Sequence, residues 1–324
     1  MEVATPPNAP PVFLAPMAGI TDLPFRNLVK RFGASGVVSE MVASKEMVQA
    51  KAGVREKAEL GAGAADTAVQ IAGREAKWMA EAAKLVAGDG AQVIDINMGC
   101  PAKKVTGGLS GSALMRTPDH ALTLVEAVVK AVDVPVTLKM RLGWDDASMN
   151  AAEIAKRAEA AGVQRITVHG RTRCQFYKGR ADWRAIADVC RAVNIPVIAN
   201  GDITDAASAR AALAASGAAG VMVGRGIQGK PWLLAQILAD LSGEQPEPAP
   251  LTRDLADLVT EHFVETLAFY GTELGSRVVR KHLGWYLDWL GAVPPTQRRA
   301  ILTESDPVRT LSLLRETFTE RYAA

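Results

Sequence analysis

The sequence predicts an α/β fold: a TIM (β/α)8 barrel followed by a small all-α helical domain. Eight short apolar segments alternate with eight segments of helical period along the first three-quarters of the chain. Strands separated by helices of this length pair in parallel, and eight such units close into a barrel. A polar, Pro-rich segment then precedes a region without any strand-like pattern. The predicted parts are a barrel at 1–241, a linker at 242–250 and a helical domain at 251–324.

Each barrel unit has its own signal in the sequence. The predicted strands lie at 12–15, 36–39, 67–71, 93–97, 136–140, 165–169, 197–200 and 220–223. The helices that follow them are expected at 23–32, 44–50, 75–87, 118–132, 150–160, 182–192, 205–214 and 231–241. Turn residues such as Ala161-Gly162 stand between helix ends and the next strands. A doubly wound open sheet is the rival fold, but no Gly-x-Gly-x-x-Gly follows an early strand. Further helices are expected at 255–270, 275–290 and 306–319.

Composition narrows the class of protein. The chain has 324 residues, of which 48% are hydrophobic, and this is enough for a large core. Its three cysteines are too scattered for a disulfide framework, and none has the spacing of metal ligands. No apolar run reaches the length of a membrane span, and the first residues do not resemble a signal peptide. We therefore expect a soluble, cytoplasmic protein without a metal. The net charge of +2 neither requires nor excludes a nucleic-acid partner.

A cysteine follows the fourth predicted strand. The apolar run that begins at Val93 breaks at Asn97-Met98-Gly99, and Cys100 stands between Gly99 and Pro101. Gly99 permits unusual backbone angles and Pro101 favours an extended conformation at Cys100, so the thiol is expected in a shaped loop at the end of a strand. The alternative is a small buried cysteine in a tight turn.

The residues that end the barrel strands are expected to meet at one rim, where barrel enzymes carry their chemistry. The candidates are Pro16, Met17, Ala18, Gln70, Asn97, Cys100, Lys139, Arg141, His169, Arg171, Asn200, Gly201, Asp202, Gly224, Arg225 and Gly226. The loops after the last two strands often bind phosphate, and glycines with an arginine suit that purpose. These glycines could instead merely close tight turns.

Two rim residues allow more than one interpretation. Lys139 lies in an otherwise apolar strand, where a lysine is costly to bury without a partner. It could serve as a Schiff-base lysine, as in barrel aldolases. His169 could be a neutral core histidine. Their common rim with Cys100 favours a functional interpretation for both.

Seven motifs in order resemble the tRNA-dihydrouridine synthase family, most closely its bacterial B-type branch. They are Ala15-Pro-Met-Ala-Gly-Ile-Thr-Asp22, Asn97-Met-Gly-Cys-Pro101, Lys139-Met-Arg141, His169-Gly-Arg-Thr-Arg173, Asn200-Gly-Asp202, Gly224-Arg225 and Arg280-Lys-His-Leu-Gly-Trp-Tyr286. The resemblance covers essentially the whole chain, including the linker and the helical tail.

The resemblance implies an FMN enzyme, reduced by NADPH, that saturates the C5–C6 bond of a uridine in the tRNA D-loop. Pro16, Met17, Ala18 and Gln70 would border the isoalloxazine, and Lys139 and His169 would face its polar edge. Asn200, Gly201, Asp202, Gly224 and Arg225 would take the ribityl phosphate. Hydride would pass to C6, Cys100 would protonate C5 from the other face, and Asn97 would hold the uracil. A thiol suits this role because its usual pKa of about 8.5 keeps it protonated at neutral pH.

The predicted RNA surface is local. The region 251–324 has nine Arg and Lys residues against ten Asp and Glu residues, so it is not basic as a whole. Arg277, Arg280 and Lys281 share one helix face, although such a face is also typical of an ordinary amphipathic helix. Together with the rim cations they are expected to bind tRNA near its D-loop and elbow. The expected substrate-binding residues are Asn97, Lys103, Arg141, Arg171, Arg173, Arg277, Arg280 and Lys281.

Three alternatives remain. The chain could be an FMN barrel that acts on a free pyrimidine, similar to dihydroorotate or dihydropyrimidine dehydrogenases. It could be a non-catalytic RNA-binding barrel, or an aldolase that uses Lys139. Assays with free uracil and with tRNA, the colour of the pure protein and borohydride trapping would separate these possibilities.

Overall fold

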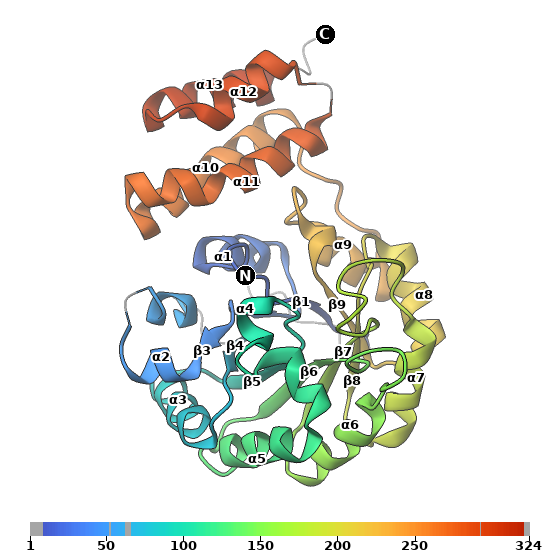
Figure 1. The fold of residues 1–324 in the computed structure, drawn as a ribbon. Helices are drawn as coiled ribbons and strands as arrows, with labels where there is room; N and C mark the ends of the chain where they lie inside the picture. Colours follow the sequence, from blue (N-terminus) through green and yellow to red (C-terminus); the bar gives the residue numbers. More distant parts are fainter. Residues whose placement is uncertain (1–8, 52, 62–65, 292, 321–324) are drawn as a thin grey trace.

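The computed structural model describes residues 9–51, 53–61, 66–291 and 293–320 and shows a closed parallel β-barrel (Figure 1). Neighbouring strands pair in parallel around the barrel, and the pairing of β2 with β4 closes it. The predicted TIM barrel is therefore confirmed. Its strands are β1 (Val12–Leu14), β2 (Gly36–Val38), β4 (Thr67–Ala72), β5 (Val93–Met98), β6 (Val136–Arg141), β7 (Arg165–His169), β8 (Val197–Asn200) and β9 (Gly220–Val223).

Helices surround the barrel and connect consecutive strands (Figure 1). They are α1 (Leu23–Phe32), α2 (Ser44–Val48), α3 (Ala76–Gly88), α5 (Pro118–Val129), α6 (Ala151–Ala160), α7 (Trp183–Ala192), α8 (Ala206–Ser216) and α9 (Leu233–Leu241). Several short elements beside the rim were not predicted, among them a strand and a helix. The two-residue strand β3 (Val42–Ala43) extends the sheet beside β4, and the short helix α4 (Lys103–Thr106) follows the Cys100 loop.

Local chemistry explains several helix boundaries. The side chain of Asp22 accepts a hydrogen bond from the Phe25 N–H at the start of α1, and Asp205 caps α8 with a full capping box through Ser208. Gly217 ends α8 with a positive φ of 66°, a conformation that favours glycine.

The two sides of the barrel strands differ in chemistry. Residues such as Ile94, Ile96 and Leu138 belong to the large apolar core between the sheet and its helices. Because side chains alternate along a strand, the residues between them face the barrel interior. A small apolar cluster fills part of that interior, and it contains Phe13, Ala15, Val38, Ala68, Ile198 and Met222. The remaining inward positions of β4 to β8 are mostly polar, so this side of the interior is available for chemistry rather than packing alone.

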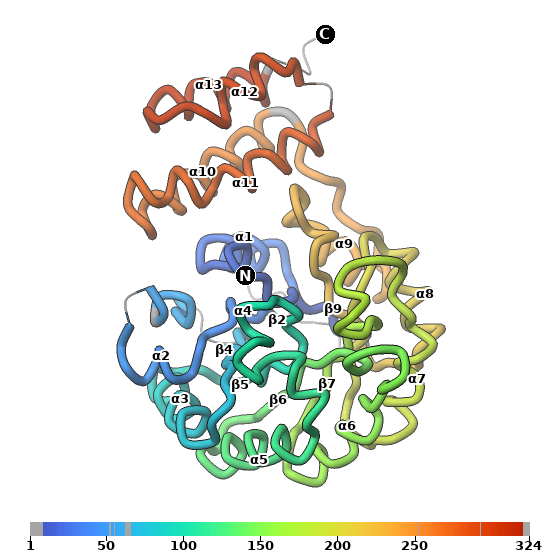
Figure 2. The backbone as a smooth tube through the Cα atoms, viewed as in Figure 1, coloured from blue at the N-terminus to red at the C-terminus, as the bar shows by residue number. Residues whose placement is uncertain are grey.

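Four helices follow the barrel after an extended segment. They are α10 (Thr252–Tyr270), α11 (Thr272–Leu290), α12 (Pro295–Thr303) and α13 (Pro307–Glu320). Three were predicted and α12 was not. Helix α1 lies between the barrel and α10 and α11, while α12 and α13 lie on the far side of these two helices (Figures 1 and 2). Among the described residues, no helix is both long and apolar enough to cross a membrane.

Candidate functional site

A cavity of about 660 Å³ opens at the carboxyl ends of the barrel strands. This volume is within the range of small-molecule and cofactor sites. The structure brings all the predicted rim residues together in its wall, Gly226 among them. These residues are Pro16, Met17, Ala18, Gln70, Asn97, Cys100, Lys139, Arg141, His169, Arg171, Asn200, Gly201, Asp202, Gly224, Arg225 and Gly226.

The loop that carries Cys100 is anchored on both sides. The Asn97 side-chain oxygen accepts hydrogen bonds from the N–H groups of Gly99 (3.2 Å) and Cys100 (3.0 Å). The Cys100 carbonyl in turn accepts from both the N–H and the hydroxyl of the buried Ser112. Arg141 donates from Nε to the Gly99 carbonyl at 2.8 Å. The half-buried thiol is therefore presented to the cavity by a fixed loop.

A row of buried polar side chains lies beneath this loop, in the barrel interior. The strand register places Gln70 beside Asp95, and Asp95 beside Thr137. Gln70 Nε2 and Thr137 Oγ1 each donate to one Asp95 carboxylate oxygen, both at 2.6 Å. Burial raises the pKa of Asp95, while the two hydrogen bonds act in the opposite direction. The sequence analysis did not select Asp95 and Thr137, although polar residues at alternate positions of apolar strands were a visible signal.

Lys139 is almost fully buried and donates from Nζ to the Asn200 side-chain oxygen at 3.0 Å. Asn200 completes its own bonding through Nδ2, which donates to the Met222 carbonyl at 2.8 Å. Burial, reinforced by the nearby Arg141, lowers the pKa of Lys139 from 10.5 to about 8. At physiological pH the amine is therefore close to its titration range. Lys139 is one of the residues that line the cavity.

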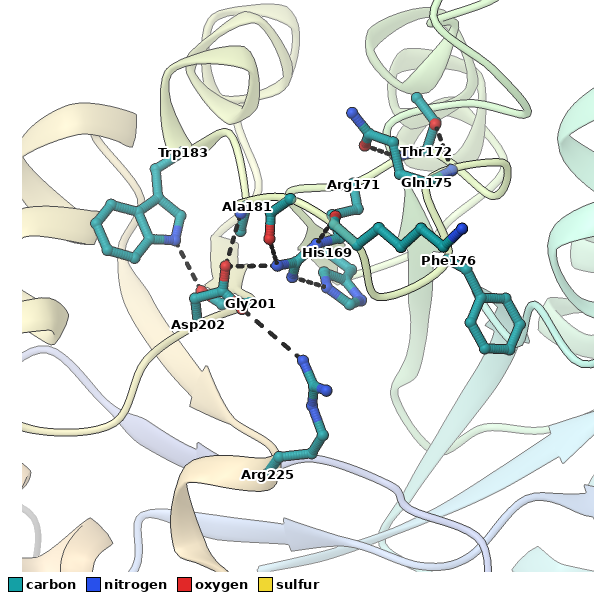
Figure 3. A network of polar contacts seen from close by, with 12 residues as sticks. His169, Arg171, Thr172, Gln175, Phe176, Ala181, Trp183, Gly201, Asp202 and Arg225 are labelled. Atoms are coloured by element: carbon teal, nitrogen blue, oxygen red, sulfur yellow. Dashed lines mark hydrogen bonds and ion pairs between the residues drawn. The ribbon is translucent and has the colours of Figure 1, made fainter.

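A second network links the loops after β7 and β8 (Figure 3). The guanidinium of Arg171 donates to Asp202 at 2.6 Å and to the carbonyls of Lys178 and Gly179, and one of its nitrogens lies 3.3 Å from His169 Nε2. Burial, followed by the surrounding cations, lowers the pKa of His169 well below its usual value. His169 is therefore neutral at physiological pH.

Three predicted ligand-binding residues have their polar atoms engaged by the chain itself. Arg141 is buried and donates to the carbonyls of Gly99, Thr172 and Phe176, so it fastens the Cys100 loop to the loop after β7. Arg171 is equally buried in its network. The Asp202 carboxylate accepts from Arg171 and from the Ala181 N–H, and it lies 3.9 Å from Arg225. These contacts place the three side chains to hold the walls of the cavity.

The three glycines of the predicted phosphate site differ in what surrounds them. A Cβ on Gly226 would lie 2.4 Å from the Ile203 carbonyl oxygen, and one on Gly201 would lie 2.8 Å from Ala181. Both residues are therefore required by loop packing. A Cβ on Gly224 would meet only Ala15 and Met17, at 3.8 Å or more, so this glycine leaves its space to the cavity.

Two exposed aromatic residues in the wall were not predicted. Phe176 and Tyr177 come from the loop after β7 and line the cavity mouth. The Tyr177 ring lies 4.8 Å from the Arg225 guanidinium and 5.5 Å from that of Arg141. An aromatic pair in a polar loop that ends in Lys178-Gly179 was the available sequence signal.

The remaining predicted residues lie outside the cavity wall. Lys103 is exposed on α4, and Arg173 packs on the Trp144 ring with its guanidinium 4.7 Å from the ring centroid. Arg277 is exposed on α11 and Arg280 is half-buried there. In the described part of the chain neither of these two forms an ion pair. The Lys281 amine lies 2.9 Å from the position of a Cβ on Gly19, so it faces the loop after β1.

The chain resembles known proteins over most of its length. The sequence model of the Dihydrouridine synthase (Dus) family matches residues 13–322. A Rhodobacter capsulatus protein named "Probable tRNA-dihydrouridine synthase" is 66% identical over 97% of both chains. A Pseudomonas putida protein named "tRNA-dihydrouridine synthase B" is 48% identical over 85% of this chain and 82% of its own.

Solved structures support the fold alone. A histamine dehydrogenase from Rhizobium sp. 4-9 has a TM-score of 0.53 at 13% identity, covering 78% of this chain and 48% of its own. A morphinone reductase mutant in complex with tetrahydroNAD has a TM-score of 0.50 at 14% identity, covering 74% and 89%.

Proposed function

Because this chain belongs to the dihydrouridine synthase family, we propose that it reduces the C5–C6 double bond of a D-loop uridine in tRNA to 5,6-dihydrouridine. The observation that carries the proposal is the position of Cys100. Its thiol lies in the wall of the same cavity as Lys139 and the glycine loops after β8 and β9. A candidate acid and a candidate phosphate-binding rim thus line one cavity. The names of the relatives support tRNA as the substrate.

The residues in the wall fit FMN. Lys139 offers a cationic donor, and His169 lines the same cavity. The exposed Arg225 guanidinium lies next to Gly224, which leaves its space to the cavity. Pro16, Met17, Ala18 and Gln70 would border the ring system, while Gly201, Gly224 and Arg225 would bind the phosphate. FMN, reduced by NADPH, would supply the hydride that C6 receives.

The chain itself would supply the proton and the orientation of the base. Hydride addition at C6 leaves negative charge on C5 and the C4 oxygen, so an acid must deliver a proton to C5. Cys100 would give that proton and regain one from solvent. Asn97 uses one Nδ2 hydrogen for Gln70 at 2.7 Å, and its second Nδ2 hydrogen remains for a uracil carbonyl in the cavity.

The helical region would hold the rest of the tRNA. A base enters the cavity only after leaving its stack, which favours a loop nucleotide over a paired one. Arg277 and Arg280 on α11 offer phosphate contacts, and Lys103 adds charge at the rim. We propose the division into a barrel at 1–241, a linker at 242–250 and a tRNA-binding domain at 251–324 on this basis.

The test replaces the proposed acid. In Cys100→Ala, we expect FMN to bind and NADPH to reduce it as in the wild type, because neither step needs the thiol. Dihydrouridine formation in unmodified tRNA should fall by about 10²-fold or more, the usual contribution of a positioned acid. Mass spectrometry of digested tRNA measures the product.

Cys174→Ser is the matched control, because it removes an exposed thiol, and it should leave product formation unchanged. Normal turnover by Cys100→Ala would overturn the assignment of the acid. Reduction of free uridine but not of tRNA would replace the proposed substrate with a free pyrimidine.

A further inference from the structure

An unbroken chain of hydrogen bonds connects the barrel interior with the Cys100 loop. Thr137 donates to Asp95, and Gln70 Nε2 donates to the other Asp95 oxygen. Asn97 Nδ2 donates to Gln70 Oε1 at 2.7 Å, and the N–H groups of Gly99 and Cys100 donate to Asn97 Oδ1. From the loop to Gln70 every donor points toward Asp95, and Thr137 donates to Asp95 from the other side.

The two ends of the chain impose this direction. The backbone N–H groups of Gly99 and Cys100 can only donate, and at the other end both Asp95 oxygens accept, one from Gln70 and one from Thr137. Gln70 and Asn97 lie between these ends, and each has a donor and an acceptor on opposite sides of its amide. If either amide turned over, two donors or two acceptors would face one another, in a site where unmatched polar groups are costly.

We propose that Asp95 is a positioning residue for the acid: it sets the direction of the Gln70 and Asn97 amides, and through them it fixes the Cys100 loop. Asp95 does not line the cavity, so it acts only through its neighbours. The strand register supplies the spacing, because Gln70 and Thr137 flank Asp95 on adjacent strands. This inference rests on the proposed function only where it calls Cys100 the acid.

The proposal predicts that the carboxylate can exchange places with an amide. In Asn97→Asp, the carboxylate at position 97 still accepts from Gly99 and Cys100. Its other oxygen then faces Gln70 Oε1, and turning Gln70 over only moves the mismatch to Asp95. Adding Asp95→Asn supplies a donor at position 95, so Gln70 can turn over and every link is matched again, with Thr137 still donating to an oxygen.

The experiment measures the alkylation of Cys100 by iodoacetamide, followed by peptide mass spectrometry, in a Cys174→Ser/Cys190→Ser background. At pH values high enough to deprotonate the thiol completely, the alkylation rate reaches a plateau. This plateau rate reports how freely the loop opens. Asn97→Asp should raise this rate by about tenfold, the effect of one unmatched buried polar pair. Asp95→Asn alone should change it by less than about threefold, because the amide oxygen can still accept from Gln70 while Thr137 accepts from the new NH₂. The combined Asp95→Asn/Asn97→Asp variant should return to within about twofold of the wild type.

Asp95→Leu combined with Asn97→Asp is the control for charge. It removes the same carboxylate but offers Gln70 no donor, so it should stay as reactive as Asn97→Asp alone. If it does not fold, the comparison of Asn97→Asp with and without Asp95→Asn still decides, because both carry the same carboxylate beside the thiol.

The proposal would be overturned if Asp95→Asn/Asn97→Asp were alkylated as fast as, or faster than, the two single effects added together predict. It would also be overturned if Asp95→Leu/Asn97→Asp returned to the wild-type rate as fully as Asp95→Asn/Asn97→Asp does. No arm of this experiment contains tRNA or NADPH. Its failure is therefore distinguishable from failure of the proposed function, which Cys100→Ala tests.

Discussion

Lys139 combines burial with a titration range close to neutrality. Its amine is held by Asn200 inside a wall of other cations, and burial lowers its pKa to about 8. The charged form binds an electron-rich ligand more strongly than the neutral form does. Protonation of this one side chain should therefore control how well the cavity binds an anionic cofactor.

The flavin-free protein should lose affinity for FMN as the pH rises. Lys139 is mostly protonated below about pH 8 and mostly neutral above it, so we expect the affinity to fall by about tenfold between pH 7 and pH 9. Quenching of FMN fluorescence measures the affinity. Lys139→Met should bind more weakly at pH 7 and show a flatter profile. An unchanged slope in this variant would assign the titration to another group.

The loop between β1 and α1 shows how one element connects the cavity with the helical region. Met17 and Ile20 line the cavity, while Gly19 lies under Lys281 of α11. Asp22 caps α1 and is buried, and its Oδ1 accepts a hydrogen bond from the Phe25 N–H. Burial raises the pKa of Asp22 from 3.8 to about 6 against the effect of the Phe25 N–H.

Asp22→Asn should change the pH dependence of stability. The folded-state pKa of Asp22 is raised, so the folded protein binds more protons than the unfolded chain, and this group costs stability as the pH rises from about 4 to about 6. The full effect is about 3 kcal/mol in the free energy of unfolding. The difference in stability between Asp22→Asn and the wild type should therefore shift in favour of the variant between about pH 4 and pH 7, in urea unfolding experiments.

Asp205→Asn is a control of opposite sign. Hydrogen bonds from the Ser208 N–H and hydroxyl lower the pKa of this exposed cap. It therefore stabilises the protein at neutral pH and loses that contribution in acid. Asp205→Asn should be destabilised at pH 7, and the loss should shrink as the pH falls. The same slope in both variants would contradict the assignment for Asp22.

At the scale of the whole molecule, the cationic face of α11 should bind tRNA independently of cavity chemistry. Arg277→Glu/Arg280→Glu should weaken tRNA binding by about tenfold or more and reduce its salt dependence, because each lost phosphate contact lowers the slope by about one. NADPH oxidation should be unchanged. Filter binding at several salt concentrations measures the tRNA affinity and its salt dependence.

Arg309→Glu/Arg315→Glu is the matched control. It makes the same change in charge on α13, which lies on the far side of α10 and α11 from the barrel (Figure 1). This variant should bind tRNA nearly as the wild type does. Equal losses in the two variants would show that net charge, rather than the α11 face, determines binding.

The sequence predicted the barrel well because each strand is a short apolar run between turn residues, and the closure of eight units follows from their number. It did not predict β3, since Val42–Ala43 has only two residues. Helix α12 was missed because its first residue, Pro295, follows another proline and the pair resembles a turn. Proline is nevertheless well tolerated in the first turn of a helix, and of the residues in α12 only Ile301 is buried.

The sequence predicted which residues lie at the site better than it predicted what their side chains contact. Residues at the carboxyl ends of strands had to share one rim, and the cavity contains them. The partners of Arg141 and Arg171 depend on backbone carbonyls of the loop after β7, whose path has no periodic signal. Asp95 could have been noticed as a polar residue in an apolar strand, but the role proposed for it depends on how the Gln70 and Asn97 amides are oriented, and sequence pattern carries no information on amide orientation.

The contact between Gly229 and α11 bears on how such a protein can be altered. A Cβ on Gly229 would lie 2.4 Å from the Trp285 carbonyl oxygen, and the glycine has a φ of 74°. Main chain rests on main chain at this point, without a side chain as a spacer. In a hybrid of this barrel with a C-terminal bundle from another protein, the Gly229 surface would fit only a helix whose backbone follows the path of α11. The barrel and its bundle should therefore be exchanged together.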